Sequence, residues 1–174
     1  MSSVTNASNW IAPARKQMET ARRSSAVLVV DDEPGMRNFL LKALVQECAL
    51  VETADSVEAA EELRQRYHFD LLIVDIRLPG QSGVEWLGAL RQQAVDTDVI
   101  VMTAYADLET SISALRGGAS DFLLKPFRVE QMLTAVRRCL ERRRMARENF
   151  LLKRAARPDG IEGIVGASSA IADM

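Results

Sequence analysis

The sequence LLIVDIRLPG, residues 71–80, joins an unbroken apolar run to an aspartate and then to a loop with proline and glycine. A run that is apolar on both faces is typical of a central strand in a parallel sheet, so residues 69–75 are predicted to form one. The earlier stretch AVLVVDD, residues 26–32, has the same form and ends in Asp31 and Asp32. Two such strands, each followed by a helix-length segment, indicate an α/β fold.

Outward from these two runs, the chain continues to alternate. Short apolar runs predict three more strands, over residues 50–54, 98–103 and 119–124. Amphipathic segments predict helices over residues 34–48, from Ser56 onward, from about 83 to 93, over 108–116, and from about Val129 past Arg147. Because parallel strands need right-handed crossovers, this order predicts a doubly wound sheet of five parallel strands with helices on both faces.

The composition and the length of the apolar runs limit the number of domains and the cellular location that can be expected. The 174 residues suit one domain with appendages, and 48% of them are hydrophobic. The apolar runs fall far short of the roughly 18 residues of a membrane span, so no membrane partner is expected. The N-terminus has no apolar signal region, and two separated cysteines suit a reducing compartment, so a cytoplasmic location is predicted. The Arg-rich run 137–147 is predicted to form a solvated helix face.

Chemistry-bearing residues stand where the predicted strands end. Asp31 and Asp32 follow the first strand, Asp75 ends the third, Thr103 the fourth, and Lys125 the fifth. The carboxyl ends of parallel strands lie at one edge of a sheet, where such folds bind ligands. Carboxylates that converge repel each other, and Mg²⁺ relieves that repulsion through oxygen ligands. A lysine and a hydroxyl nearby suit a phosphoryl group, with an aspartate as the nucleophile.

Four segments resemble the signature segments of response-regulator receiver domains: VLVVDDEP (27–34), LLIVDIRLPG (71–80), VMTAY (101–105) and DFLLKPF (121–127). The resemblance covers residues 26–140 and implies a flavodoxin-like fold with strand order 2-1-3-4-5. It implies that Asp75 is the phosphoacceptor. Asp31 and Asp32 would then help Asp75 to hold Mg²⁺, together with the backbone carbonyl of Arg77.

The same resemblance implies a switch. Thr103 would move toward the phosphoryl group, Lys125 would pair with it, and Phe122 matches the aromatic switch position. A cis peptide bond before Pro126 is also implied. The partner would be a sensor histidine kinase, and the domain would be no enzyme beyond accepting the phosphoryl group and removing it from itself.

The C-terminal sequence GIEGIVGASSAIADM, residues 160–174, resembles the opening of the AAA+ ATPase domain in nitrogen-regulator-type activators of sigma-54 RNA polymerase. This implies sigma-54 RNA polymerase and DNA as partners of a full-length protein, with the present chain ending before the phosphate-binding loop. The expected organisation is a mobile extension (1–25), a receiver domain (26–140), a linker helix (141–158) and the start of a truncated ATPase domain (159–174).

A homodimer is also expected. No glycine or proline interrupts residues 129–156, so the last helix is predicted to continue into the linker. Leu133, Val136, Leu140 and Met145 trace an imperfect apolar stripe, which resumes at residues 150–152. Pairing with a second copy would bury this stripe.

The same residues allow two alternative functions. An aspartate nucleophile with Mg²⁺ and lysine also describes haloacid-dehalogenase-type phosphatases, but these carry a second aspartate two residues after the nucleophile, where this chain has Arg77. The other alternative is a receiver-like interaction module that is never phosphorylated, against which the complete acidic set and Lys125 argue.

Overall fold

The computed structural model describes residues 24–104 and 117–155, which fold into a parallel sheet between two helical layers. The five strands are β1 (Ala26–Val30), β2 (Leu50–Ala54), β3 (Leu71–Asp75), β4 (Asp98–Ala104) and β5 (Asp121–Lys125). Their order in the sheet is β2-β1-β3-β4-β5, and all neighbours are parallel. The predicted fold class and strand order are confirmed.

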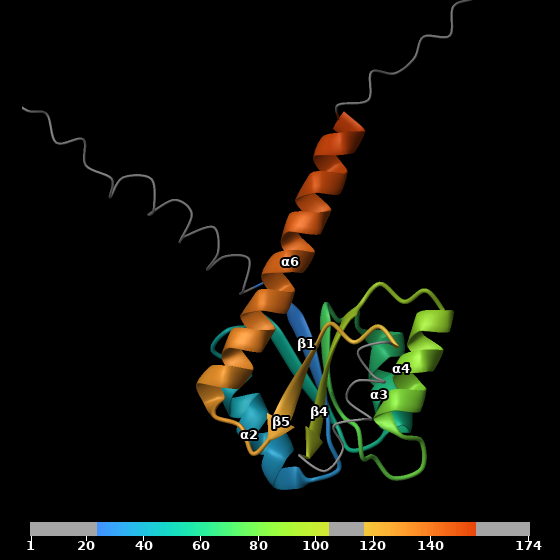
Figure 1. Cartoon of the computed structure of the whole chain (residues 1–174), viewed down its shortest axis with the longest axis vertical. Coiled ribbons are helices and arrows are strands. Elements are labelled where there is room, and N and C mark those ends of the chain that lie inside the picture. The colour runs from blue at the N-terminus through green and yellow to red at the C-terminus, as the bar shows by residue number, and fades with distance from the viewer. Residues whose placement is uncertain (1–23, 105–116, 156–174) are drawn as a thin grey trace, which may run out of the picture.

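Helices cover both faces of the sheet (Figure 1). Those of the described ranges are α2 (Pro34–Leu44), α3 (Val57–Arg66), α4 (Gly83–Gln92) and α6 (Val129–Ala155). Alternate strand residues face opposite sides, so Leu28 and Leu72 pack toward α3 and α4 while Val27 and Leu71 pack toward α2 and α6. The sheet therefore separates two apolar cores; β3 is buried throughout, and β1 is buried from Val27 to Val30.

Local sequence explains where several helices begin. Pro34 opens α2 at a position whose missing N–H is not needed there. Ser56 caps α3 by accepting from the Ala59 N–H. Ser82 and Glu85 form a reciprocal capping box at the start of α4.

Element ends differ from the predictions by a few residues. Helix α2 ends at Leu44 rather than at Cys48, because the chain turns there and the Ala49 N–H bonds to the Ser25 carbonyl to begin β2. Strand β5 begins at Asp121 and extends to Lys125, which pairs in register with Ala104. The helix predicted over 108–116, most of the extension 1–25 and the segment 159–174 lie outside the described residues.

Helix α6 runs without a break from Val129 to Ala155, as the sequence predicts, and its second half extends away from the sheet (Figure 1). The arginines of this helix are predicted to be solvated, and that is confirmed for Arg138, Arg142 and Arg147, which are 65%, 53% and 68% exposed, but it is wrong for Arg143. Arg143 is only 10% exposed and pairs with Asp70 and Asp96. Its partners lie at the amino ends of β3 and β4, which helical periodicity does not reveal.

Candidate functional site

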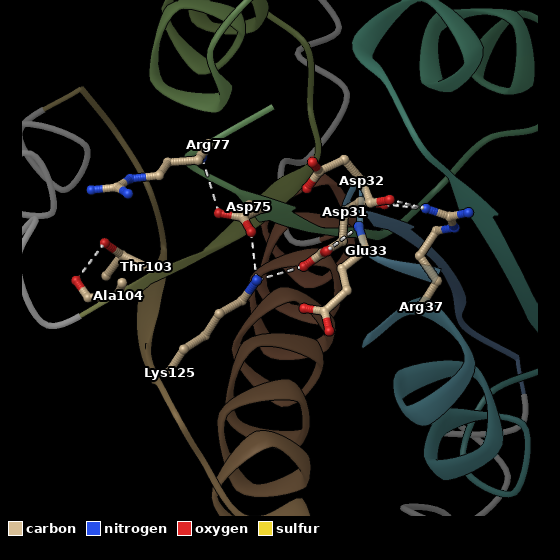
Figure 2. Close-up of polar contacts among 9 residues, drawn as sticks. All are labelled: Asp31, Asp32, Glu33, Arg37, Asp75, Arg77, Thr103, Ala104 and Lys125. Atoms are coloured by element: carbon tan, nitrogen blue, oxygen red, sulfur yellow. Dashed lines mark hydrogen bonds and ion pairs between the residues drawn. The ribbon is translucent and has the colours of Figure 1, made fainter. Parts of the chain in front are cut away.

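Three carboxylates meet at the carboxyl edge of the sheet, just beyond β1 and β3 (Figure 2). One oxygen from each of Asp31, Asp32 and Asp75 lies within 4.8 Å of the others. Asp31 is fully buried and Asp75 is 7% exposed, whereas Asp32 faces solvent. Parallel register explains the meeting, because Val30 of β1 pairs with Val74 of β3, so Asp31 directly after β1 and Asp75 at the end of β3 lie side by side. The predicted convergence is confirmed for these three residues.

Lys125 lies between two of the carboxylates. Its Nζ is 2.7 Å from Asp31 Oδ2 and 2.5 Å from Asp75 Oδ2. Burial alone lowers the pKa of the Lys125 ammonium, but its hydrogen bonds to Asp31 and Asp75 outweigh burial and raise that pKa. Lys125 therefore stays charged in the site. The peptide bond between Lys125 and Pro126 is cis, as the sequence resemblance implies.

Burial dominates at Asp31. Loss of water raises the pKa of this carboxyl, although Lys125 and the Glu33 N–H, which donates to Asp31 Oδ1 at 2.9 Å, both act to lower it. The negative charge of Asp75 raises it further. The buried Asp31 carboxylate therefore needs a positive charge close by to remain ionised.

The loop after β3 orients Asp75. The Arg77 N–H donates to Asp75 Oδ1 at 2.9 Å, while Oδ2 accepts from Lys125 (Figure 2). Both oxygens of Asp75 are thereby fixed. The structure thus shows the Arg77 N–H as a hydrogen-bond donor to Asp75. That the Arg77 carbonyl is a ligand of Mg²⁺ stays a prediction.

Thr103 and Phe122 do not join this network. Thr103 is 1% exposed, and its hydroxyl donates to the Ala104 carbonyl at 3.1 Å. Figure 2 shows it on the far side of Asp75 from Asp31 and Asp32. Phe122 pairs in register with Val101, and its half-buried side chain packs against the α3–α4 core. Thr103 lies at the carboxyl edge of the sheet and Phe122 lies three residues before Lys125 in β5, and neither forms a hydrogen bond with any of the three carboxylates.

Two site residues were missed by sequence reasoning. Arg37 of α2 donates to the backbone carbonyls of Asp31 and Asp32, and Gly83 packs directly against the carbonyl of Asp75. The partners in both cases are main-chain atoms, which carry no sequence signal. The only available clue was that both residues follow the acidic strand ends closely along the chain.

The donor set fits a hard divalent cation. Among the described residues, Lys125 is the cation that forms ion pairs with carboxylates of this cluster, so negative charge is in excess there, and the exposed Asp32 leaves the cluster open to solvent. Mg²⁺ prefers carboxylate oxygens and keeps several waters, which an open site allows. The residues present therefore fit Mg²⁺.

A family model for the response regulator receiver domain matches residues 27–137. The chain belongs to that family. The match includes every residue of the acidic cluster and Lys125, and it places the chain apart from the haloacid-dehalogenase-type phosphatases. Receiver domains generally bind Mg²⁺ at an acidic pocket, interact with histidine kinases and often dimerise.

Relatives of this receiver are regulators. The C4-dicarboxylate transport transcriptional regulatory protein DctD of Pseudomonas aeruginosa is 38% identical over 74% of this chain and 28% of its own length. The regulatory protein AtoC of Escherichia coli is 36% identical over 70% of this chain and 26% of its own. The chain thus spans little more than a quarter of the length of these relatives.

Solved structures agree with the fold. NtrX from Brucella abortus superposes with a TM-score of 0.70 at 30% identity, covering 74% of this chain and 29% of that one. A response regulator receiver domain protein from Clostridium thermocellum gives a TM-score of 0.65 at 25% identity and covers 70% of this chain and 98% of that one. Within the residues described, no helix is both long and apolar enough to span a membrane.

Proposed function

We propose that Asp75 accepts a phosphoryl group from the phosphohistidine of a sensor histidine kinase. The observation that carries this proposal is the double fixation of its carboxylate by Lys125 and the Arg77 amide, beside two further carboxylates. An oxygen of Asp75 attacks phosphorus, the histidine nitrogen leaves, and an aspartyl phosphate forms. The chain is a phosphoryl acceptor that loses the group by its own slow hydrolysis, not an enzyme acting on outside substrates.

Each neighbour of Asp75 has a role in this transfer. Asp31, Asp32, Asp75 and the Arg77 carbonyl would hold Mg²⁺, which supplies positive charge to offset the phosphoryl oxygens. The Lys125 ammonium lies 2.5 Å from Asp75 Oδ2 and pairs with a phosphoryl oxygen once the carboxylate is phosphorylated. Its alternative partner, Asp31, lies at 2.7 Å and keeps it in place meanwhile.

Thr103 and Phe122 would convert phosphorylation into a change of shape. The Thr103 hydroxyl donates to the Ala104 carbonyl, and it must give up this bond to reach the phosphoryl group. Movement of Thr103 would leave room for the Phe122 side chain, which packs against the α3–α4 core from β5. The equilibrium between two arrangements of the surface at β5 and α6 then shifts toward the one that the phosphoryl group favours.

The output is proposed to be transcription. The relative DctD is named as a transcriptional regulatory protein and AtoC as a regulatory protein, and residues 160–174 resemble the start of a sigma-54 activator ATPase domain. We therefore assign residues 26–140 to a cytoplasmic receiver, 141–158 to a linker, and 159–174 to the start of an output ATPase domain. In the full-length protein this domain would act on sigma-54 RNA polymerase at DNA, with a homodimer as the working unit.

Intact mass spectrometry tests the central claim. Incubation with acetyl phosphate and Mg²⁺ should add the mass of one phosphoryl group, and Asp75→Asn should abolish the addition. Asp32→Ala should slow it and raise the Mg²⁺ concentration required. Asp96→Asn is a matched control, because Asp96 is 89% exposed at the opposite edge of the sheet, and it should behave as wild type. Phosphorylation of Asp75→Asn at the wild-type rate would rule the assignment out.

A further inference from the structure

Arg37 contacts the acidic site through its backbone. Its Nη1 donates to the Asp31 carbonyl at 2.7 Å and to the Asp32 carbonyl at 2.9 Å. Figure 2 shows the guanidinium on the side of Asp31 and Asp32 away from Lys125. One nitrogen thus holds two consecutive peptide units, the two that carry the paired aspartates.

The hydrogen bonds of Arg37 matter more for the backbone of Asp32 than for that of Asp31. Asp31 is fixed twice besides, since its N–H bonds to the Ala54 carbonyl and its Oδ1 accepts from the Glu33 N–H. Asp32 is different. Among residues 24–104 and 117–155, no hydrogen bond or ion pair holds its exposed carboxylate. The position of that carboxylate therefore depends on the backbone of residue 32, and Arg37 is the side chain that fixes this backbone.

We propose that Arg37 is a positioning residue for the cation site, which lowers the ordering cost of Mg²⁺ binding by holding the Asp31–Asp32 backbone. The proposal rests on the proposed function of this pocket. Arg37 is itself held in α2, where its own N–H bonds to the Glu33 carbonyl across the helix start. Residues that orient ligands in this way commonly contribute tenfold or more to metal affinity.

Electrostatics alone predicts the opposite sign. A guanidinium next to a cluster of carboxylates repels Mg²⁺, so removal of its charge should strengthen cation binding if charge were its only effect. Removal of its hydrogen bonds frees the loop and should weaken cation binding. The direction of the change therefore separates a positioning role from a simple charge effect.

Calorimetric titration of the unphosphorylated protein with Mg²⁺ provides the test. Arg37→Met keeps an unbranched apolar stem but has neither charge nor donors, and it should weaken Mg²⁺ binding about tenfold. Arg37→Lys keeps a positive charge and N–H donors at this position and should recover part of the loss. Lys42→Met is the matched control, because it removes an exposed charge from the last turn of the same helix, and it should leave the affinity unchanged.

Two further readouts complete the test. With acetyl phosphate, Arg37→Met should need more Mg²⁺ for half-maximal phosphorylation and approach the wild-type rate at saturation. Hydrogen exchange at the Glu33 amide should become faster in Arg37→Met while core amides stay protected. Unchanged or tighter Mg²⁺ binding by a folded Arg37→Met would overturn the positioning role. A wild-type protein that binds no Mg²⁺ and gains no phosphoryl group would instead overturn the proposed function.

Discussion

At the scale of single residues, the site depends on the absence of a side chain at Gly83. A Cβ built there would lie 2.2 Å from the Asp75 carbonyl oxygen and 3.0 Å from Val74 Cγ1. Both neighbours belong to β3, and backbone cannot move aside cheaply. Gly83→Ala should therefore lower the free energy of unfolding by about 1–3 kcal/mol and slow phosphorylation, because Asp75 must shift. Urea denaturation and the acetyl phosphate assay measure the two effects.

Gly88 provides the control for that substitution. It lies in the same helix, and a Cβ there would meet nothing within 4 Å. Gly88→Ala should leave phosphorylation unchanged and stabilise the protein by about 0.5–1 kcal/mol, since alanine orders more readily in a helix. Equal effects of the two substitutions would contradict the close approach at Gly83.

The two cysteines give a pH dependence at the same scale. Burial raises the pKa of both the Cys48 and the Cys139 thiol to about 11 from 9.0. Because the folded thiols keep their protons longer, their stabilising effect is complete below pH 9 and is lost as the pH rises toward 11. Between these values the unfolding free energy of wild type should fall more steeply with pH than that of Cys48→Ala/Cys139→Ala. Parallel slopes in urea titrations would contradict this.

At the scale of elements, α6 is tied to the amino edge of the sheet by an arginine clasp, formed by Arg138, Arg142, Arg143 and Arg147 with Asp121, Asp98, Asp96 and Asp70. Arg143 dominates because it is 10% exposed, whereas Arg142 is 53% exposed and pairs at 3.8 Å. Exposed pairs contribute roughly 0–1 kcal/mol.

Loss of Arg143 should therefore be costly. Its Nε lies 3.5 Å from Asp70 Oδ1, and Asp70 Oδ2 accepts from the Ala26 N–H, so one carboxylate joins α6 to β1. Arg143→Met should destabilise the protein by about 1–3 kcal/mol and speed hydrogen exchange in the second half of α6. Lys153→Met, at the exposed end of the same helix, should stay within about 0.5 kcal/mol of wild type. A similarly small effect of Arg143→Met would show that the arginine clasp contributes little to the free energy of unfolding.

The clasp also shows where sequence reasoning stops. The alternation of apolar runs and amphipathic segments was enough to predict five parallel strands, because each pattern is local. The meeting of Asp31, Asp75 and Lys125 followed from the rule that parallel strands end at one edge. The partners of Arg143 lie 47 and 73 residues away in the sequence, so its burial could not be predicted from helical periodicity.

The same limit applies within the site. Arg37 and Gly83 act on carbonyl oxygens, and every residue has one, so no pattern of residue types marks them. Thr103 was predicted from its strand end and lies at that edge, but its hydroxyl bonds to Ala104 rather than to the carboxylates. Position along a strand is therefore more predictable than the partner of a side chain.

At the scale of the whole molecule, the clasp explains how an arginine-rich helix can still pair with a second copy. Like charges in the 142–147 stretch would oppose pairing if they faced a partner. Several of them instead turn toward carboxylates of their own domain. Beyond them, the consecutive residues Phe150, Leu151 and Leu152 are 60%, 64% and 67% exposed, and contiguous exposed apolar surface is typical of an interaction site.

We predict that this apolar end of α6 pairs with the same end of a second copy. Phe150 and Leu151 line a groove with Arg143, Arg147 and Asp96, in which a partner helix would find both apolar contact and a charged border. Light scattering at micromolar concentration should report a dimer, and Phe150→Glu/Leu151→Glu should shift it toward monomer. Lys153→Glu, which changes charge on the same turns without removing apolar surface, should remain dimeric. If the double variant still scatters light as a dimer, the dimer interface lies at the receiver surface formed by β5 and the first half of α6 rather than at the helix end.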